Sequence, residues 1–224
     1  MGENMNKKMT YILLSGFFTC AVLAFIEHGI EINYVIKTAC KISFFFIVVW
    51  VYMKLFKDFH FKQVLALSKM GRREWLKVTI LGISSAGIVL AAYLLFLPQI
   101  DLNLIQQDLT DRLGITATGF IFVGIYVSFG NSLLEEYFFR GFIFFNLPRK
   151  WGYIYSPLLF ASYHIPMIML WFTAEIILIC FIGLWVVGVV FHLVNEKNRT
   201  IWASWIIHIC ADLMIIIIGL NLFY

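Results

Sequence analysis

The sequence predicts an all-α fold, a polytopic bundle of transmembrane helices with about seven spans. The chain of 224 residues is 62% hydrophobic and only 13% charged, with a mean hydropathy of +0.88. Soluble domains average about 45–50% apolar and about 25% charged residues, so this composition has no soluble explanation. The apolar residues also gather in runs near the ~20 residues that a helix needs to cross the hydrocarbon core. We therefore expect one integral membrane domain over residues 1–224.

Seven apolar runs have the length of a membrane span. They lie at about 9–27, 38–56, 75–97, 115–145, 153–172, 174–194 and 201–221. The first follows Lys7 and Lys8 but no small-x-small cleavage site closes it, which predicts an uncleaved first span. The fourth is too long for a simple crossing, so we expect it to tilt or to continue beyond the bilayer.

The loops between these runs alternate in charge. Thirteen of the 17 Lys and Arg residues fall in the N-terminus and in loops of the same parity, while most acidic loop residues fall in the others. The positive-inside rule places the basic loops in the cytosol. The sequence thus predicts a multi-pass cell-membrane protein with a cytosolic N-terminus and a C-terminus outside.

The charge pattern and the cysteines exclude several other classes of protein. No stripe of Lys and Arg interleaves with aromatic residues on a polar surface, so we expect no nucleic-acid partner. None of the four cysteines has CxxC spacing, which argues against a disulfide framework and a zinc knuckle. The expected partners are the lipid bilayer and a peptide or protein substrate at the membrane.

Ionisable residues inside the predicted spans are candidates for function, because each costs about 2.5–3.5 kcal/mol on insertion scales. In NSLLEEYFFRGF, Glu136 and Arg140 are i,i+4 neighbours and can form an ion pair. Glu135 points about 100° away from Glu136 and has no such partner within its own helix. The motif therefore supplies one neutralised and one available carboxylate. The alternative is a purely structural ion pair with Glu135 reaching toward the cytosol.

Two further motifs place imidazoles inside spans. His164 follows Phe160 by one turn in FASYHIP, and His208 shares a helix face with Asp212 in SWIIHICADL. Each histidine on its own is also explained as a hydrogen-bonded packing residue. Counting ~1.5 Å per residue from the cytosolic span ends, however, places His164, His208 and Glu135 at roughly similar depths. This agreement favours convergence of the three side chains in one cavity.

Taken together, these motifs resemble the CPBP family, which comprises type II CAAX prenyl endopeptidases and bacteriocin-processing or self-immunity (Abi) proteins. The resemblance covers about residues 115–220, a segment similar to the catalytic core of that family. It implies transmembrane helices around a cavity open to the cytosol and hydrolysis of a peptide bond. The matching positions are Glu135-Glu136-x-x-x-Arg140, Phe160-x-x-x-His164 and His208-x-x-x-Asp212.

The same resemblance implies a role for each of these residues. Glu135 would be the general base for a water, assisted by His164. His208 and Asp212 would stabilise the oxyanion, while Glu136, Arg140 and Phe160 would support the site. Preorganised donors of this kind supply a large electrostatic contribution to catalysis.

Asp212 departs from the family pattern, which often has Asn at this position. An aspartate donates a hydrogen bond only when it is protonated, so Asp212 would otherwise accept one from His208. A further alternative is a metal site, because the set Glu135, His164, His208 and Asp212 is chemically suitable for zinc. The sequence leaves open whether any metal or other cofactor is bound.

Three functions are compatible with the motifs. The first is an intramembrane endopeptidase, with or without a catalytic metal (a metalloendopeptidase in the first case), acting on a prenylated CAAX tail, a bacteriocin leader or a signalling pre-peptide. The second is a non-catalytic self-immunity or peptide-binding membrane protein. The third, a proton-coupled transporter, is disfavoured because no internal repeat is visible. The resemblance favours the endopeptidase.

Overall fold

The computed structural model describes residues 2–59, 61–67 and 70–224, and these residues form helices and no strand. The long helices are α1 (Gly2–Gly29), α2 (Tyr34–Phe56), α4 (Arg72–Phe96), α8 (Arg149–Ile168), α9 (Ala174–Glu196) and α10 (Trp202–Leu220). Residues 117–144 form another long helical segment, made of α6 (Ala117–Ile125), η3 (Tyr126–Asn131), α7 (Ser132–Glu135) and η4 (Glu136–Phe144). Shorter elements are α3 (Phe61–Val64), η1 (Leu97–Gln99), α5 (Leu102–Gln107) and η2 (Asp108–Arg112).

Local side chains fix where several helices begin. Asn33 caps α2 by accepting a hydrogen bond from the backbone N–H of Ile36 at 3.0 Å. Thr116 caps α6 in the same way, accepting from Gly119 at 3.1 Å. Such caps satisfy backbone donors that the first helical turn leaves without a partner. They set the starts of α2, which carries Lys41, and of the helical segment 117–144, which carries the paired glutamates.

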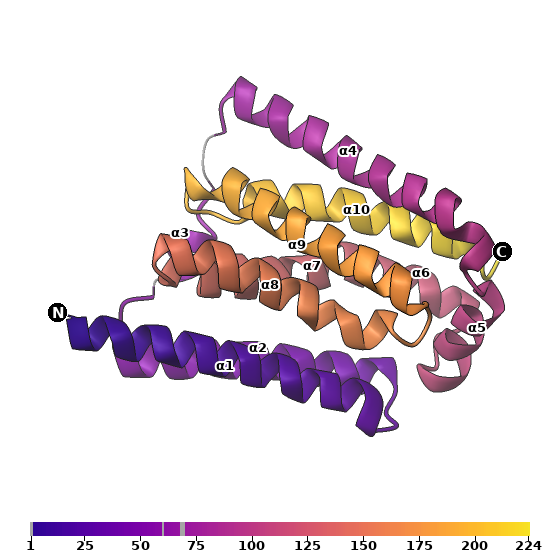
Figure 1. Ribbon diagram of the computed structural model, residues 1–224, viewed down its shortest axis with the longest axis horizontal. Coiled ribbons are helices and arrows are strands. Elements are labelled where there is room, and N and C mark those ends of the chain that lie inside the picture. The colour runs from indigo at the N-terminus through magenta and orange to yellow at the C-terminus, as the bar shows by residue number, and fades with distance from the viewer. Residues whose placement is uncertain (1, 60, 68–69) are drawn as a thin grey trace.

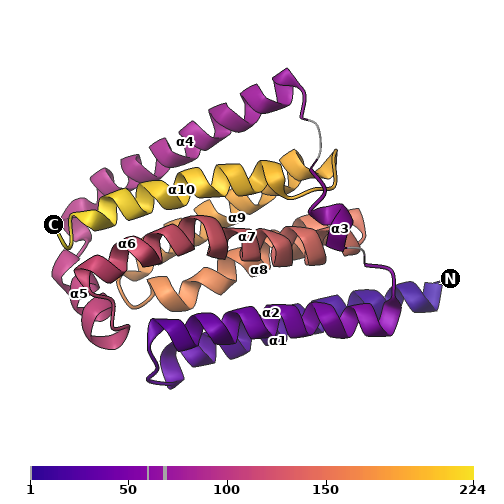
Figure 2. The ribbon, with the colours of Figure 1, turned by 180° about the vertical axis from the view of Figure 1, so that it is seen from behind.

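The long helices run back and forth along the bundle, and the two termini lie at opposite ends (Figure 1). The same path is visible from behind (Figure 2). Consequently the basic starts of α4 and α8 lie at the end of the bundle that holds the N-terminus, and the acidic α5–η2 region lies at the other. The loops that alternate in charge along the sequence therefore lie at opposite ends of the molecule.

The all-helical fold is confirmed, and each predicted span coincides with a helical segment. Six segments of the described residues are long and apolar enough to cross a membrane, one fewer than predicted. The difference is α8, the fifth predicted span, which is not among the six. Its first turn holds Arg149 and Lys150, and its interior holds two prolines, Pro157 and Pro166. α8 nevertheless runs the length of the bundle, packed on α1, α9 and η4.

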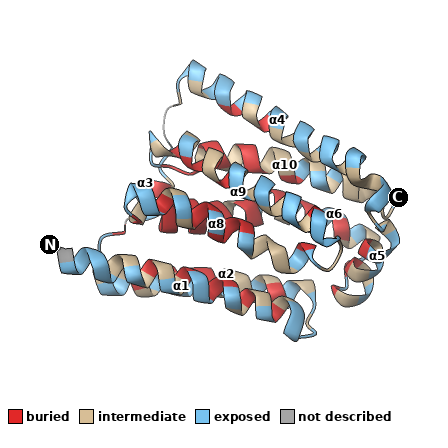
Figure 3. Ribbon diagram, viewed as in Figure 1, coloured by how far each residue is buried: buried red, intermediate tan, exposed pale blue. Residues whose placement is uncertain are grey.

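Aromatic side chains form the main core between α1, α2, α8 and η4. Phe45 of α2 stacks on Phe138 of η4 with ring centroids 4.0 Å apart, and Phe139 meets Phe160 of α8 edge-on at 5.4 Å. The buried residues accordingly gather in the central helices (Figure 3). This packing holds α2 and α8 against the helix that carries the two glutamates.

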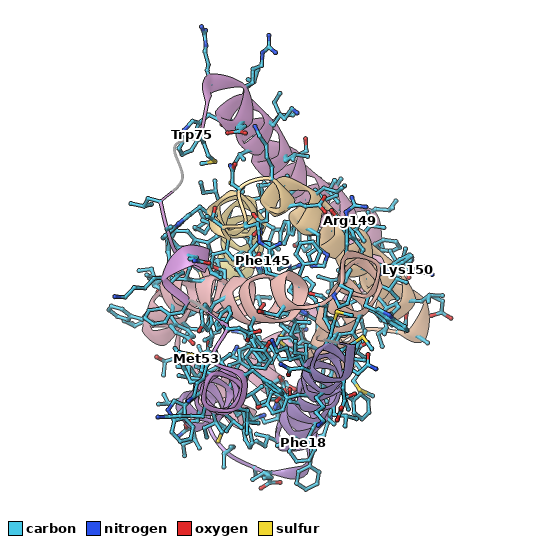
Figure 4. The ribbon with its side chains drawn as sticks, turned by 90° about the vertical axis from the view of Figure 1, so that its left-hand side faces the viewer. Phe18, Met53, Trp75, Phe145, Arg149 and Lys150 are labelled. Carbon is cyan, nitrogen blue, oxygen red and sulfur yellow. The ribbon has the colours of Figure 1, made fainter. Side chains whose placement is uncertain are left out.

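Helix α4 lies at the edge of the bundle and packs chiefly on α10. Figure 4 looks along the bundle toward the ends marked by Trp75, Arg149 and Lys150, with α4 set apart from α1 and α2. Ser85 of α4 donates a hydrogen bond to the backbone oxygen of Ile207 at 3.2 Å. The position of α10, which carries His208, is therefore stabilised from the outer side by α4.

Candidate active site

Glu136 is the centre of a fully buried hydrogen-bond network at the start of η4. Its Oε1 accepts from Arg140 Nη1 and from His208 Nδ1, each at 3.0 Å. Its Oε2 accepts from the hydroxyl of Ser204 on α10. Ser204 in turn accepts from Asn195 Nδ2 at 2.6 Å, which brings α9 into the network. Both carboxylate oxygens of Glu136 are thus occupied, and the carboxylate joins η4 to α10.

The predicted Glu136–Arg140 ion pair is confirmed, with both side chains completely buried. The guanidinium of Arg140 also lies 4.0 Å from the ring centre of Phe160 and 4.7 Å from that of Phe191. A cation over two aromatic faces gains electrostatic stabilisation in a desolvated site. Phe160, for which a supporting role was expected, covers Arg140 and packs on His164.

Glu135 is also buried, 2% exposed, but its two oxygens have different surroundings. Oε1 accepts a hydrogen bond from Asn131 Nδ2 at 2.8 Å and lies 3.8 Å from Lys41 Nζ. Glu135 also has a hydrogen-bond partner on its own helix, Asn131, which lies one turn earlier and which the expectation about ion pairs did not include. The partner is an amide rather than a base, so it forms a hydrogen bond and not an ion pair with the carboxylate.

The other oxygen of Glu135, Oε2, is buried and has no hydrogen-bond partner within the described part of the chain. It lies 3.6 Å from Nε2 of His164 and 4.0 Å from Nε2 of His208. The expected convergence of these three side chains, which come from α7, α8 and α10, is confirmed. Both distances are longer than a direct N–H···O hydrogen bond.

The two imidazoles are oriented by their other nitrogens. His164 Nδ1 lies 2.8 Å from the backbone oxygen of Phe160, and a carbonyl can only accept, so Nδ1 carries the proton. In the neutral ring, Nε2 of His164 is then an acceptor that faces Glu135. His208 Nδ1 donates to Glu136, so the fully bonded carboxylate also fixes the second ring.

Asp212 lies at the edge of this group. Its Oδ1 is 3.7 Å from His208 Nε2, beyond hydrogen-bond range, and its Oδ2 is buried with no partner among the residues that the structure describes. Asp212 therefore neither orients the His208 ring in this arrangement nor is itself held by a side chain. It adds a carboxyl group on the side of His208 opposite Glu136.

Sequence reasoning missed Lys41 and Asn131. Lys41 lies inside the second predicted span, and its ammonium donates a hydrogen bond to Asn131 Oδ1. A lysine within an apolar run is the same signal that singled out Glu135, so it was available in the sequence. Which neighbouring helix the lysine faces depends on packing, which the sequence alone does not give.

The geometry does not favour a metal. In residues 2–59, 61–67 and 70–224, no three or more His, Cys, Asp or Glu side chains are grouped so that they could hold a metal ion. Lys41 also presents its ammonium to Glu135, where a bound cation would meet like charge. The zinc alternative thus does not fit these side chains as placed.

The site side chains are enclosed by neighbouring helices. Two hollows at the surface are lined by other residues, one by Arg149, Lys150, Tyr153, Ile154 and Leu193 and the other around Phe145, Asn146 and Arg199. Neither is the cavity that was expected around Glu135. Among the site residues, Lys41 and His164 retain the most exposed side chains, 17% and 16%.

Comparison with known families gives one result. Residues 115–214 match the family model described as type II CAAX prenyl endopeptidase Rce1-like. This segment, slightly less than half of the chain, is therefore similar to that family. No curated protein and no solved structure matches the chain. The Rce1-like segment includes Glu135, His164, His208 and Asp212, whereas Lys41 of α2 lies outside it.

Proposed function

We propose that this protein is an intramembrane endopeptidase in which Glu135 and His164 activate a water. The observation that carries the proposal is the relation between Glu135 Oε2 and His164 Nε2, 3.6 Å apart and both hydrogen-bond acceptors. Glu135 Oε2 is buried and without a partner in the described residues, so two acceptors that face each other here need a donor between them. A water molecule, with two protons to donate, meets this need and is held by both groups at once.

The reaction then proceeds by general-base catalysis. The water oxygen attacks the carbonyl carbon of the scissile peptide bond while one of its protons passes to Glu135 Oε2. The resulting tetrahedral intermediate carries negative charge on the former carbonyl oxygen. When the C–N bond breaks, the proton held by Glu135 passes to the departing nitrogen, which leaves as an amine. Glu135 ends the cycle ionised, as it began.

His208 stabilises the developing negative charge in this proposal. Its Nδ1–H is committed to Glu136, so the ring presents Nε2 toward the centre of the site. With both nitrogens protonated, the ring donates from Nε2 to the oxyanion. A donor whose orientation is fixed in advance is effective because it does not reorganise during the reaction. Asp212, beside Nε2, is placed to contact the same oxygen when protonated.

We further propose a membrane-associated peptide as the substrate, either a lipidated C-terminal tail or a leader peptide. The Rce1-like match supports a prenylated CAAX tail as the first probe. The basic ends of α4 and α8 support a cytosolic position for the end of the bundle that carries the N-terminus. A substrate whose lipid lies in the bilayer would reach the site by diffusion within the membrane.

The test is cleavage of an internally quenched, farnesylated CAAX peptide by the purified protein in liposomes. Glu135→Gln keeps the size of the side chain and an oxygen for Asn131, but removes the base. We expect this variant and His164→Ala each to reduce kcat by at least about 100-fold. The control is Glu175→Gln, which changes an exposed glutamate at the start of α9 and should leave kcat unchanged.

A Glu135→Gln protein that still cleaves the peptide at the wild-type rate would overturn the mechanism. If the wild-type protein does not cleave the prenylated peptide, the CAAX substrate is wrong. Mass spectrometry of membrane peptides from cells with the wild-type or the Glu135→Gln protein then searches for the leader-peptide class. Peptides that accumulate only with the variant would identify it.

A further inference from the structure

We propose that Lys41 of α2 is a positioning residue that, through Asn131, sets which oxygen of Glu135 faces the reaction. The inference rests on the proposed function, since it concerns the orientation of the proposed base. It also extends the site beyond the Rce1-like segment, because α2 lies outside residues 115–214.

Three side chains form a short chain of contacts across two helices. Lys41 Nζ donates to Asn131 Oδ1, and Asn131 Nδ2 donates to Glu135 Oε1 at 2.8 Å. Lys41 Nζ also lies 3.8 Å from the same Oε1. Asn131 and Glu135 are 9% and 2% exposed, so the chain is largely shielded from solvent.

The chemistry of the three groups makes this chain directional. A lysine ammonium has donors and no acceptor, so it can face only the oxygen of the Asn131 amide. That contact turns the amide nitrogen toward Glu135. Without the ammonium, the amide gains freedom to turn its oxygen toward the carboxylate, where two acceptors would repel. Lys41 thereby fixes the amide, and the amide fixes the carboxylate.

The consequence appears at the opposite oxygen of Glu135. With Oε1 held by Asn131 and Lys41, Oε2 is left to face the Nε2 atoms of His164 and His208. A base needs its reactive atom held within a fraction of an ångström, and a misplacement of about 1 Å can cost about 100-fold in rate. Lys41 acts on the rate through Glu135 and makes no contact with the reacting atoms.

Other lysines of α2 show that this placement is specific to Lys41. Lys37, one turn earlier, pairs with Glu27 at 3.1 Å near the start of the helix. Lys54, in the last turn, lies over the ring of Trp50. Lys54 lies near the helix end, where a lysine readily reaches an interface. Lys37 is buried, but its partner Glu27 is partly exposed. Lys41 instead turns inward toward buried partners, at the energetic cost of a charge within the membrane.

The experiment measures kcat and KM for the farnesylated CAAX peptide with three variants. Lys41→Met, which keeps the aliphatic stem, should lower kcat by about 10- to 100-fold and leave KM within about twofold. Lys41→Arg, another donor-only cation, should restore kcat to within about fivefold of the wild type. Lys37→Met is the matched control, because it removes an ion pair from the same helix away from Glu135, and its kcat should be unchanged.

A double variant tests the pathway. Because Lys41 acts through Asn131, Lys41→Met combined with Asn131→Leu should be no slower than the slower single variant. If Lys41→Met fails to fold, Lys41→Gln replaces it and should also lower kcat, since its amide can present either atom to Asn131. A wild-type kcat in Lys41→Met or Lys41→Gln, a change confined to KM, or multiplying effects in the double variant would each overturn the inference.

The outcome for Glu135→Gln separates this inference from the proposed function. Loss of cleavage in Glu135→Gln with full activity in Lys41→Met refutes the positioning role alone. Full cleavage in Glu135→Gln refutes the proposed base, and with it the role of Lys41. Loss in both, with rescue by Lys41→Arg, is the result that we expect.

Discussion

Arg140 and Glu136 form a completely buried ion pair, with Arg140 Nη1 3.0 Å from Glu136 Oε1. Each partner has further contacts: the guanidinium lies over two aromatic rings, and the carboxylate accepts from His208 and Ser204. The pair therefore stabilises the helix packing and orients His208 at the same time.

Arg140→Met should destabilise the protein strongly. Removal of one partner leaves the charge of Glu136 buried with fewer donors, a change that typically costs about 3–5 kcal/mol. Thermal unfolding in detergent measures the effect. Adding Glu136→Gln to Arg140→Met should recover part of the lost stability, because both charges are then absent. A double variant that is less stable than Arg140→Met would contradict this explanation.

Glu135→Asp should reduce kcat by about 100-fold while the protein still folds. The shorter side chain keeps the charge but withdraws the carboxylate from the two imidazoles by about 1 Å, which is enough to cost that much in rate. The measurement is kcat with the prenylated peptide, alongside thermal unfolding of the same sample. Activity close to the wild type would show that the carboxylate position is not critical.

His208→Ala should lower kcat by about 100- to 1000-fold, the usual effect of losing one oxyanion donor. Asp212→Asn should instead stay within about tenfold of the wild type, since an amide offers an N–H donor at a position where the carboxylate has no partner in the described structure. Single-turnover rates for the two variants provide the comparison. If Asp212→Asn is as impaired as His208→Ala, the carboxyl group itself takes part in the reaction.

An effect of pH on stability is expected at the end of the bundle that holds α5 and η2, away from the N-terminus. Burial opposes ionisation of Asp108, but hydrogen bonds from Arg112 and Trp171 outweigh it and lower the pKa of Asp108 below its ordinary value of 3.8. Because the pKa is lower in the folded state, this stabilisation is complete above pH 3.8 and is lost as the pH falls through the folded value. The melting temperature of the wild type should therefore fall more steeply below pH 3.8 than that of Asp108→Asn. Parallel curves for the two proteins would contradict the assignment.

The sequence predicted the helices well because each span is specified locally. The predicted run 38–56 corresponds to α2, Tyr34–Phe56, and the run 174–194 to α9, Ala174–Glu196. The fifth predicted span, α8, is not among the six membrane-spanning candidates of the described residues, for a physical reason. α8 is flanked by other helices, so it tolerates Ser156 and His164, and its composition no longer resembles a lipid-facing segment.

The site was predictable where partners share a helix. Glu136 and Arg140 are one turn apart, so their pairing followed from helical geometry. Contacts between helices, such as Lys41 with Asn131 and Ser204 with Glu136, depend on which helices become neighbours. Periodicity within one span does not contain that information. The divergent surroundings of the adjacent residues Glu135 and Glu136 arise in this way.

The place of α10 in the chain has a consequence for biosynthesis. α10 supplies His208, Asp212 and Ser204 and is the chief packing partner of α4, yet the ribosome makes it after all the other helices described. Until α10 inserts, α4 lacks its main packing partner, and Glu136 lacks the hydrogen bonds from Ser204 and His208. A nascent chain stalled before residue 202 would therefore hold the proposed base but no oxyanion donor. The proposed proteolytic activity would begin only once α10 has been translated and inserted.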